Sequence, residues 1–152
     1  MKRDPQSLAE LKFALPYLQS MDIPVAHYLS AHLYLNGHGD KQGVEAKKAA
    51  FRHYQACVDH VGFIQLNPSS QVGIHGNLAV LYSNGHGDKQ GVEAKKAAFR
   101  HYQACVDHVG FTQFRPASQA NIHVNLAALY LNGHGDKPVS YTHLRAHETR
   151  FY

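Results

Sequence analysis

Apolar side chains between residues 68 and 83 recur at helical spacing. Four of them fall at intervals of four, three and one, on one face of a helix: Ile74, Leu78, Leu81 and Tyr82. Asn67 and Pro68 come before them as a side-chain cap and a first-turn proline, which loses no hydrogen bond there. Gly85 and Gly87 follow, and we expect both to supply the positive φ angles of a helix end and tight turn. The pattern predicts a helix over residues 68–83.

A second amphipathic pattern begins near residue 92. Its expected apolar face consists of Ala94, Ala98, Tyr102, Cys105, Val106 and Val109. The side chains expected to face water are Lys95, Lys96, Arg100, Gln103 and Asp107. Small alanine and cysteine side chains on the apolar face allow helices to approach closely. Because Gly110 ends the pattern, we predict a helix over residues 92–109 that runs antiparallel to the first.

The chain repeats this helix pair. Residues 36–63 and 84–111 are the same 28 residues, 48 positions apart, and a third copy begins at Asn132 but departs after Lys137. A unit of this kind cannot bury its apolar face alone, so neighbouring units stack. We therefore predict an all-α fold without strands, an α-solenoid of antiparallel helix pairs. Its helices are expected near residues 24–35, 44–61, 68–83, 92–109 and 116–131.

The N-terminal segment does not follow the repeat. Asp4 and Pro5 are expected to start a helix that runs through Leu8, Leu11 and Phe13. Pro16 is expected to kink or end that helix, because an interior proline removes a hydrogen bond and clashes with the previous turn. This segment is expected to act as the second helix of a degenerate preceding unit.

The end of the first helix carries a family resemblance. The run from Leu78 to Gly87, L-A-V-L-Y-S-N-G-H-G, resembles the Sel-one-like repeat (SLR), a branch of the tetratricopeptide superfamily, whose first helix ends in L-G-x-L-Y-x-x-G-x-G. The pattern returns at Leu126, Ala127, Ala128, Leu129, Tyr130, Gly133 and Gly135, and in part at Ala31, Leu33, Tyr34, Gly37 and Gly39. The family's second helix, K-A-x-x-W-Y-x-K-A-A-x-x-G, is matched more loosely by Ala50, His53, Tyr54, Cys57 and Val58, with Gly62 one place late, and again in the second copy.

This resemblance covers about residues 24–137, although the period of 48 is longer than the family's usual unit. It implies an α-solenoid used as an adaptor or scaffold. Secreted, cysteine-rich members of the family carry paired cysteines within each repeat. This chain has one cysteine per repeat, Cys57 and Cys105, so that subgroup is not implied.

The C-terminal segment breaks the repeat. Residues 139–149, VSYTHLRAHET, look like a read-through translation of a transposase sequencing adapter. On this interpretation the chain is a metagenomic gene fragment, with residues 1–137 as a single helical-repeat domain from a longer array and residues 138–152 as a non-native tail. The helix at 116–131 then lacks its partner. We expect Leu126, Leu129 and Tyr130 to be less buried than Leu78, Leu81 and Tyr82, and the exposed apolar patch to favour self-association.

Charge and hydropathy narrow the choice of partner. Residues 1–137 contain 13 Lys and Arg against 10 Asp and Glu, and both signs occur in every repeat. Mixed charge of this kind is typical of a solvated face and not of a nucleic-acid-binding stripe. No run of about 18 apolar residues is present, so we expect no membrane association. The first 13 residues lack a signal-peptide pattern, which favours the cytoplasm but says little about location in a fragment.

The sequence contains no arrangement typical of catalysis or metal binding. Eight of its histidines are four positions copied twice: 38, 53, 60, 75, 86, 101, 108 and 123. His53 and His60 lie seven positions apart, whereas metal-binding pairs on a helix usually lie three or four apart. Neither a nucleophile motif nor a phosphate loop is present, and both cysteines are expected to be buried apolar residues. We expect no catalytic residues, no metal and no cofactor, and predict that the chain is not an enzyme.

The sequence predicts a protein–protein interaction adaptor or scaffold. A protein or peptide partner is expected to contact the concave face through first-helix side chains such as His27, Asn77 and Asn125. The alternative is a regulatory or enzyme-associated repeat domain whose catalytic part lies outside the fragment. RNA binding by helical repeats is disfavoured, because it requires a stronger basic excess and base-reading positions that vary between repeats.

Overall fold

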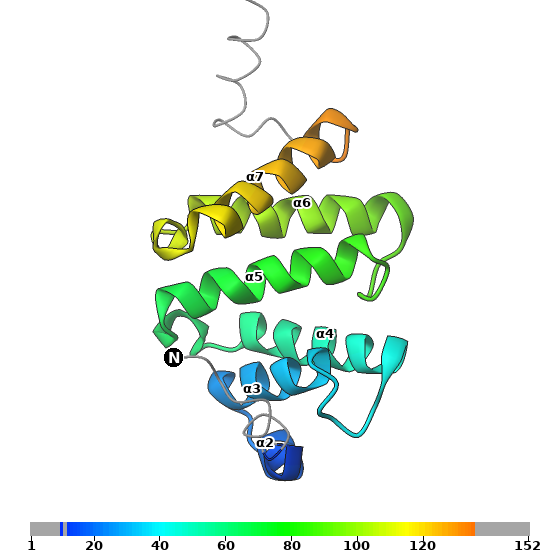
Figure 1. Cartoon of the computed structure of the whole chain (residues 1–152), viewed down its shortest axis with the longest axis vertical. Coiled ribbons are helices and arrows are strands. Elements are labelled where there is room, and N and C mark those ends of the chain that lie inside the picture. The colour runs from blue at the N-terminus through cyan, green and yellow to red at the C-terminus, as the bar shows by residue number, and fades with distance from the viewer. Residues whose placement is uncertain (1–9, 11, 136–152) are drawn as a thin grey trace, which may run out of the picture.

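The computed structural model describes residue 10 and residues 12–135, and over this part of the chain it is helical without strands. The predicted all-α class is therefore confirmed. The elements, in chain order, are η1 (Lys12–Ala14), α2 (Leu15–Gln19), α3 (Pro24–Leu35), α4 (Gly43–Asp59), η2 (Phe63–Gln65), α5 (Pro68–Ser83), α6 (Gly91–Asp107), η3 (Phe111–Gln113) and α7 (Pro116–Leu131). They are stacked along the long axis of the molecule (Figure 1).

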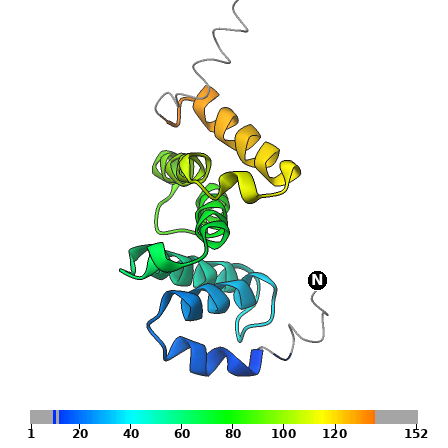
Figure 2. The same cartoon turned by 90° about the vertical axis from the view of Figure 1, so that its left-hand side faces the viewer.

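The helices form two complete pairs and one half pair. Unit one consists of α3 and α4, unit two of α5 and α6, and α7 is the first helix of a third unit. Successive units meet where α4 packs on α5 and α6 packs on α7, and α2 packs on α3 at the N-terminal end. The units follow one another as layers when the molecule is turned by 90° (Figure 2). The predicted antiparallel helix pairs are therefore present in the structure.

Small side chains hold the two helices of each unit close together. Ala50 and Cys57 in α4, and their copies Ala98 and Cys105 in α6, are completely buried. The Cys57 thiol donates a hydrogen bond to the Pro24 carbonyl oxygen at 3.3 Å. The Cys105 thiol makes the equivalent bond to the next first helix at the same distance. The prediction that both cysteines are buried apolar residues is confirmed.

The second helices end two residues earlier than expected, at Asp59 and Asp107. Val109, which was predicted to lie on the apolar face of α6, is 84% exposed beyond the helix end. At the helix end the backbone of His108 is extended, with a φ of −80° and a ψ of 139°, and its ring accepts a hydrogen bond from the Gly110 amide at 2.9 Å. Gly110 then approaches α5 so closely that a Cβ atom on it would lie 2.8 Å from the backbone of Pro68.

The two glycines of the turn after α5 act in different ways. Gly85 has a φ of +79°, as predicted. Gly87 does not have a positive φ, so that part of the prediction is wrong. A Cβ atom on Gly87 would lie 2.7 Å from the ring of Tyr82, so glycine is needed there for space. Gly91, at the start of α6, has an unforeseen positive φ of +58°.

Pro16 lies in the first turn of α2, where a missing N–H costs nothing, and the 3-10 turn η1 comes directly before this helix. Whether Pro16 kinks or ends the helix expected from Asp4 stays a prediction. Leu15 of α2 is 4% exposed and belongs to the common core. The helix expected from Asp4 lies largely outside the described residues.

The last helix differs only partly from its counterpart in unit two. Leu126 is as fully buried as Leu78, because α6 covers it, so the expectation of greater exposure is wrong at this position. Leu129 is 8% exposed against 3% for Leu81, and Tyr130 is partly exposed where Tyr82 is buried. Among the apolar side chains of α7, Val124 and Leu131 are exposed. The replaced segment 138–152 lies outside the described residues, and self-association stays a prediction.

Candidate binding groove

Two neighbouring cavities lie between the first helices α5 and α7, and residues of α6 line them as well. Their volumes are about 370 and 230 Å³. Both are lined by Val80 of α5, Tyr102 of α6 and Asn125 of α7. We call these two cavities together the α5–α7 groove. It is formed by three consecutive helices and therefore depends on the stacking of two units.

Tyr102 forms the floor of the groove, and the residue is 4% exposed. The Asn125 side-chain amide donates a hydrogen bond to the Tyr102 hydroxyl at 3.2 Å. Asn77 bonds in the same way to the hydroxyl of Tyr54, at 3.1 Å, between units one and two. Burial raises the pKa of both tyrosines, so each hydroxyl keeps a proton that it can donate. Each asparagine also retains a carbonyl oxygen that can accept a hydrogen bond.

The two ends of the groove differ in chemistry. At the polar end, the Lys95 ammonium group donates a hydrogen bond to the Ser83 carbonyl oxygen at 3.0 Å, which leaves two donors. No carboxylate is among the side chains that line this end. At the other end the walls are Gly73, Phe114 and Ile122. The groove therefore combines an apolar wall with spare hydrogen-bond donors.

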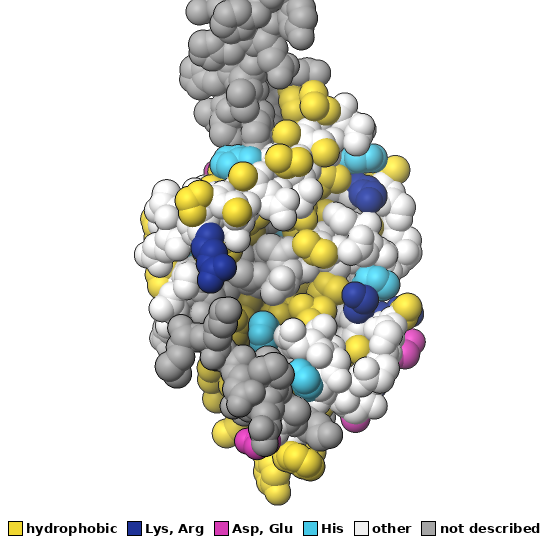
Figure 3. All heavy atoms as spheres, in the orientation of Figure 1, with side chains coloured by type: hydrophobic (Ala, Val, Ile, Leu, Met, Phe, Trp, Pro, Cys, Tyr) yellow, Lys and Arg dark blue, Asp and Glu magenta, His cyan; other side chains and the backbone are white. Residues whose placement is uncertain are grey.

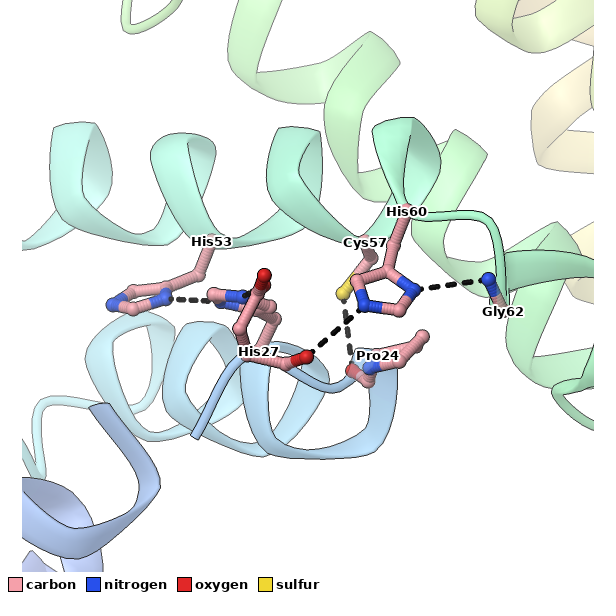
Figure 4. A network of polar contacts seen from close by, with 7 residues as sticks. Pro24, His27, His53, Cys57, His60 and Gly62 are labelled. Atoms are coloured by element: carbon pink, nitrogen blue, oxygen red, sulfur yellow. Dashed lines mark hydrogen bonds and ion pairs between the residues drawn. The ribbon is translucent and has the colours of Figure 1, made fainter. Parts of the chain in front are cut away.

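Histidine pairs join the helices of each unit. In unit one the Nδ1 atoms of His27 and His53 lie 3.1 Å apart, and His27 Nε2 lies 2.9 Å from a carboxylate oxygen of Asp22 (Figure 4). In unit two His75 and His101 approach to 2.9 Å in the same way. Since one Nδ1 must donate and the other accept, neither pair can hold a proton on both facing nitrogens. Burial lowers the pKa of His53 and His101 to about 4, so both rings are neutral at pH 7.

Each pair is followed by a tyrosine that sequence reasoning did not connect to it. The Tyr34 ring stacks on His53 and its hydroxyl donates to Asp40 at 2.7 Å. In unit two the Tyr82 hydroxyl donates to Asp88 at 2.8 Å. The hydrogen bond from Tyr34 lowers the pKa of Asp40. The aspartate of the NGHGD turn is thus held by the tyrosine six positions before it, a spacing that both copies contain and that could have been noticed.

A further repeated histidine, His60, holds the start of the linker between units one and two. His60 Nε2 lies 3.0 Å from the Asp22 carbonyl oxygen, and its Nδ1 accepts a hydrogen bond from the Gly62 amide at 2.9 Å (Figure 4). Both ring nitrogens are thereby occupied by backbone groups. Burial raises the pKa of the Cys57 thiol to about 12, which keeps it protonated and unreactive. Within residues 12–135, no three or more His, Cys, Asp or Glu side chains are grouped so that they could hold a metal ion.

Two of the three residues predicted to contact a partner line the groove, and the third does not. Asn125 lines both cavities and Asn77 lines the smaller one. His27 lies on α3, away from these cavities, and its ring contacts His53 and Asp22. Lys95, expected simply to face water, and Tyr102, expected only in the core, are groove residues that the sequence pattern did not reveal. Contact with a partner stays a prediction for all three residues.

On the face shown in Figure 3, basic and acidic side chains are scattered among apolar and polar ones and form no continuous stripe. None of the described helices has the length and hydropathy needed to cross a bilayer.

Comparison with known proteins returned no relationship. The sequence matches no protein-family model, no curated protein and no solved structure. The groove and the residues that form it are therefore the basis for inferring a function.

Proposed function

We propose that this chain is a protein-interaction scaffold that binds an extended segment of a protein partner in the α5–α7 groove. The observation that carries the proposal is the groove itself, with cavities of about 370 and 230 Å³ that open between consecutive first helices. An apolar wall with a few fixed polar groups is the usual character of a binding site. The resemblance to Sel-one-like repeats favours the same class of function.

The polar groups of the groove suit a peptide backbone. The Asn125 carbonyl oxygen can accept a backbone N–H, and the Tyr102 hydroxyl and the Lys95 ammonium group can donate to a backbone carbonyl or a carboxylate. Both the asparagine and the tyrosine are already oriented by their mutual hydrogen bond, so little ordering is needed when a partner binds. Because the groove is short, we expect affinities in the micromolar range.

A peptide selection tests the proposal. Random peptides displayed on phage would be selected on the whole chain, and the enriched sequences would be synthesised and titrated by fluorescence anisotropy. Val80→Arg should weaken their binding by about tenfold or more, because Val80 lines both cavities. Lys95→Gln should weaken binding of peptides that carry a carboxylate at the polar end.

The matched control is Val92→Arg, which makes the same change at an exposed valine of α6 that does not line the groove. Its effect should stay within about twofold. If the selected peptides bind Val80→Arg and Val92→Arg equally well, they do not use the groove and the proposal is wrong.

A further inference from the structure

The α5–α7 groove is open because unit two lacks a side chain that unit one has. Tyr28 of α3 occupies the position of Gly76 in α5, 48 residues later. The Tyr28 ring lies 6.4 Å from the ring of Tyr54, measured between centroids, at an interplanar angle of 59°. Tyr54 is the counterpart of Tyr102, the floor of the groove. The same buried tyrosine therefore packs against an aromatic ring in unit one and borders a cavity in unit two.

A second difference enlarges the same space. In unit one Tyr28 also stacks on His32, with a centroid distance of 6.0 Å and an interplanar angle of 21°. The counterpart of His32 is Val80, which is smaller, 44% exposed and part of both cavity walls. Two aromatic side chains that meet in unit one are thus replaced by glycine and valine in unit two.

We propose that the smaller cavity of the groove binds an aromatic side chain, tyrosine or phenylalanine, of the partner segment. This inference rests on the proposed function and specifies its partner. The ring would lie over Tyr102, where unit one places Tyr28, with Phe114 and Ile122 beside it. Aromatic rings gain from tilted packing on one another beyond the area that they bury. They also lose little conformational entropy on binding, which suits them as anchors.

The tyrosine side-chain analogue p-cresol is the probe for this site. It would be titrated into the ¹⁵N-labelled chain, with amide shifts followed by NMR. We expect saturable millimolar binding with the largest shifts around Gly76, Asn77 and Asn125. The saturated analogue 4-methylcyclohexanol, of similar size, should bind more weakly. Equal binding of the two compounds, or p-cresol shifts that are spread over unconnected parts of the molecule, would overturn the assignment.

Gly76→Tyr copies unit one into unit two and should fill the site. Space exists for the side chain to leave the helix, since a Cβ atom on Gly76 would lie 3.9 Å from the Cys105 sulfur, an ordinary contact. We expect p-cresol binding to fall by about tenfold or more. Val61→Tyr is the control, because it adds the same side chain at a position that is 92% exposed and lies outside the groove. Unchanged binding in a folded Gly76→Tyr protein would show that the probe binds elsewhere.

Tyr28→Ala supplies the opposite test and does not depend on the folding of Gly76→Tyr. Removal of this ring should uncover Tyr54 and create a second p-cresol site in unit one. The expected result is a new set of saturable shifts around Leu29 and Tyr54, with the site in unit two unaffected. If no second site appears although Tyr28→Ala is folded, the correspondence between Tyr28 and the bound ring is wrong.

The peptide selection separates this inference from the proposed function. Selected peptides that bind in the groove should be enriched in tyrosine or phenylalanine, and Gly76→Tyr should weaken them. Groove-binding peptides without aromatic residues would refute the aromatic anchor and leave the scaffold function intact. Binding of p-cresol without any groove-binding peptide would support the anchor site and refute the scaffold.

Discussion

Units one and two have the same second helix but different first helices. The helices α4 and α6 are identical in sequence, and both present a tyrosine, a histidine and a cysteine to the helix before them. The first helices differ at the positions above the tyrosine, where Tyr28 and His32 in unit one correspond to Gly76 and Val80 in unit two. The result is a covered floor in one unit and a groove in the other.

This comparison shows how an array can keep its fold while it changes its surface. Each second helix packs on the first helix of its own unit and on the first helix of the next, so a change there would disturb both contacts. A first helix can lose one side chain toward the groove and still bury its other face, as the complete burial of Ile74 and Leu78 shows. Binding specificity in such a stack is therefore expected to vary with the first helices.

The core position shared by Ser30 and Leu78 offers the largest test of this comparison. Both side chains are completely buried, and they occupy the same place in units one and two. Leu78→Ser should destabilise the fold by about 4 kcal/mol, because it removes a buried isobutyl group and buries a hydroxyl. Urea unfolding followed by circular dichroism measures the change. A loss below about 1 kcal/mol would mean that unit two tolerates the residue of unit one at no special cost.

Replacing the two turn glycines of unit two by alanine should destabilise the fold to different degrees. Gly87→Ala would force a methyl group to within 2.7 Å of the Tyr82 ring and 3.1 Å of the Phe51 ring, so we expect a loss of about 2 kcal/mol. Gly85→Ala should cost about 1 kcal/mol, because only its positive φ is unfavourable for alanine. Thermal and urea unfolding of the two single variants compare them directly. The reverse order would contradict the distinction between a steric and a conformational requirement.

Acid should weaken the histidine pairs. Burial lowers the pKa of His53 and His101 from 6.5 to about 4, so the unfolded chain takes up protons first as the pH falls. Stability is therefore fully present above pH 6.5 and is lost as the pH falls toward about 4. After allowance for solvent screening of these partly exposed rings, the two histidines together should contribute about 1–2 kcal/mol. The free energy of unfolding would be measured in urea at pH 7 and pH 4.5.

Single variants show which histidine pair causes the loss of stability in acid. In unit two burial also lowers the pKa of His75, the partner of His101 in the pair. His101→Asn should therefore flatten the pH dependence more than His53→Asn does. Asp22 and Asp40 do not contribute to this pH dependence between pH 7 and 4.5. The pKa of both carboxyl groups is lowered from 3.8, so they lose their hydrogen-bonded, ionised form only at a lower pH. A pH dependence that survives in the double variant would assign it to other groups.

The smallest expected effect comes from Ser30 itself. Its hydroxyl is buried and finds no hydrogen-bond partner among the described residues. Ser30→Ala should stabilise the fold by about 0.5–1 kcal/mol, because it removes an unsatisfied polar group and introduces a better helix former. Differential scanning calorimetry at pH 7 would detect the rise in melting temperature. A destabilised Ser30→Ala protein would indicate that the hydroxyl is bonded in solution.

The sequence by itself determined the helices and their pairing. The bounds of α3, α5 and α7 agree with the predicted 24–35, 68–83 and 116–131, because caps, first-turn prolines and helical spacing are local signals. The Asn67 cap is present, with its side chain accepting the Ser69 amide hydrogen bond at 2.9 Å. An exact repeat then implied that equivalent helices stack in equivalent ways.

Only the tertiary structure decided what lies between the helices. The groove, the His75–His101 pair and the approach of Gly87 to the Phe51 ring of unit one each join residues that no local pattern connects. Periodicity places a side chain on a face of its own helix, but the neighbour that it meets depends on how far apart the helices pack and at what angle. Gly76 is an example. The sequence shows a glycine in a helix, and only the packing of α5 beside Tyr102 and α7 shows that this glycine borders a cavity.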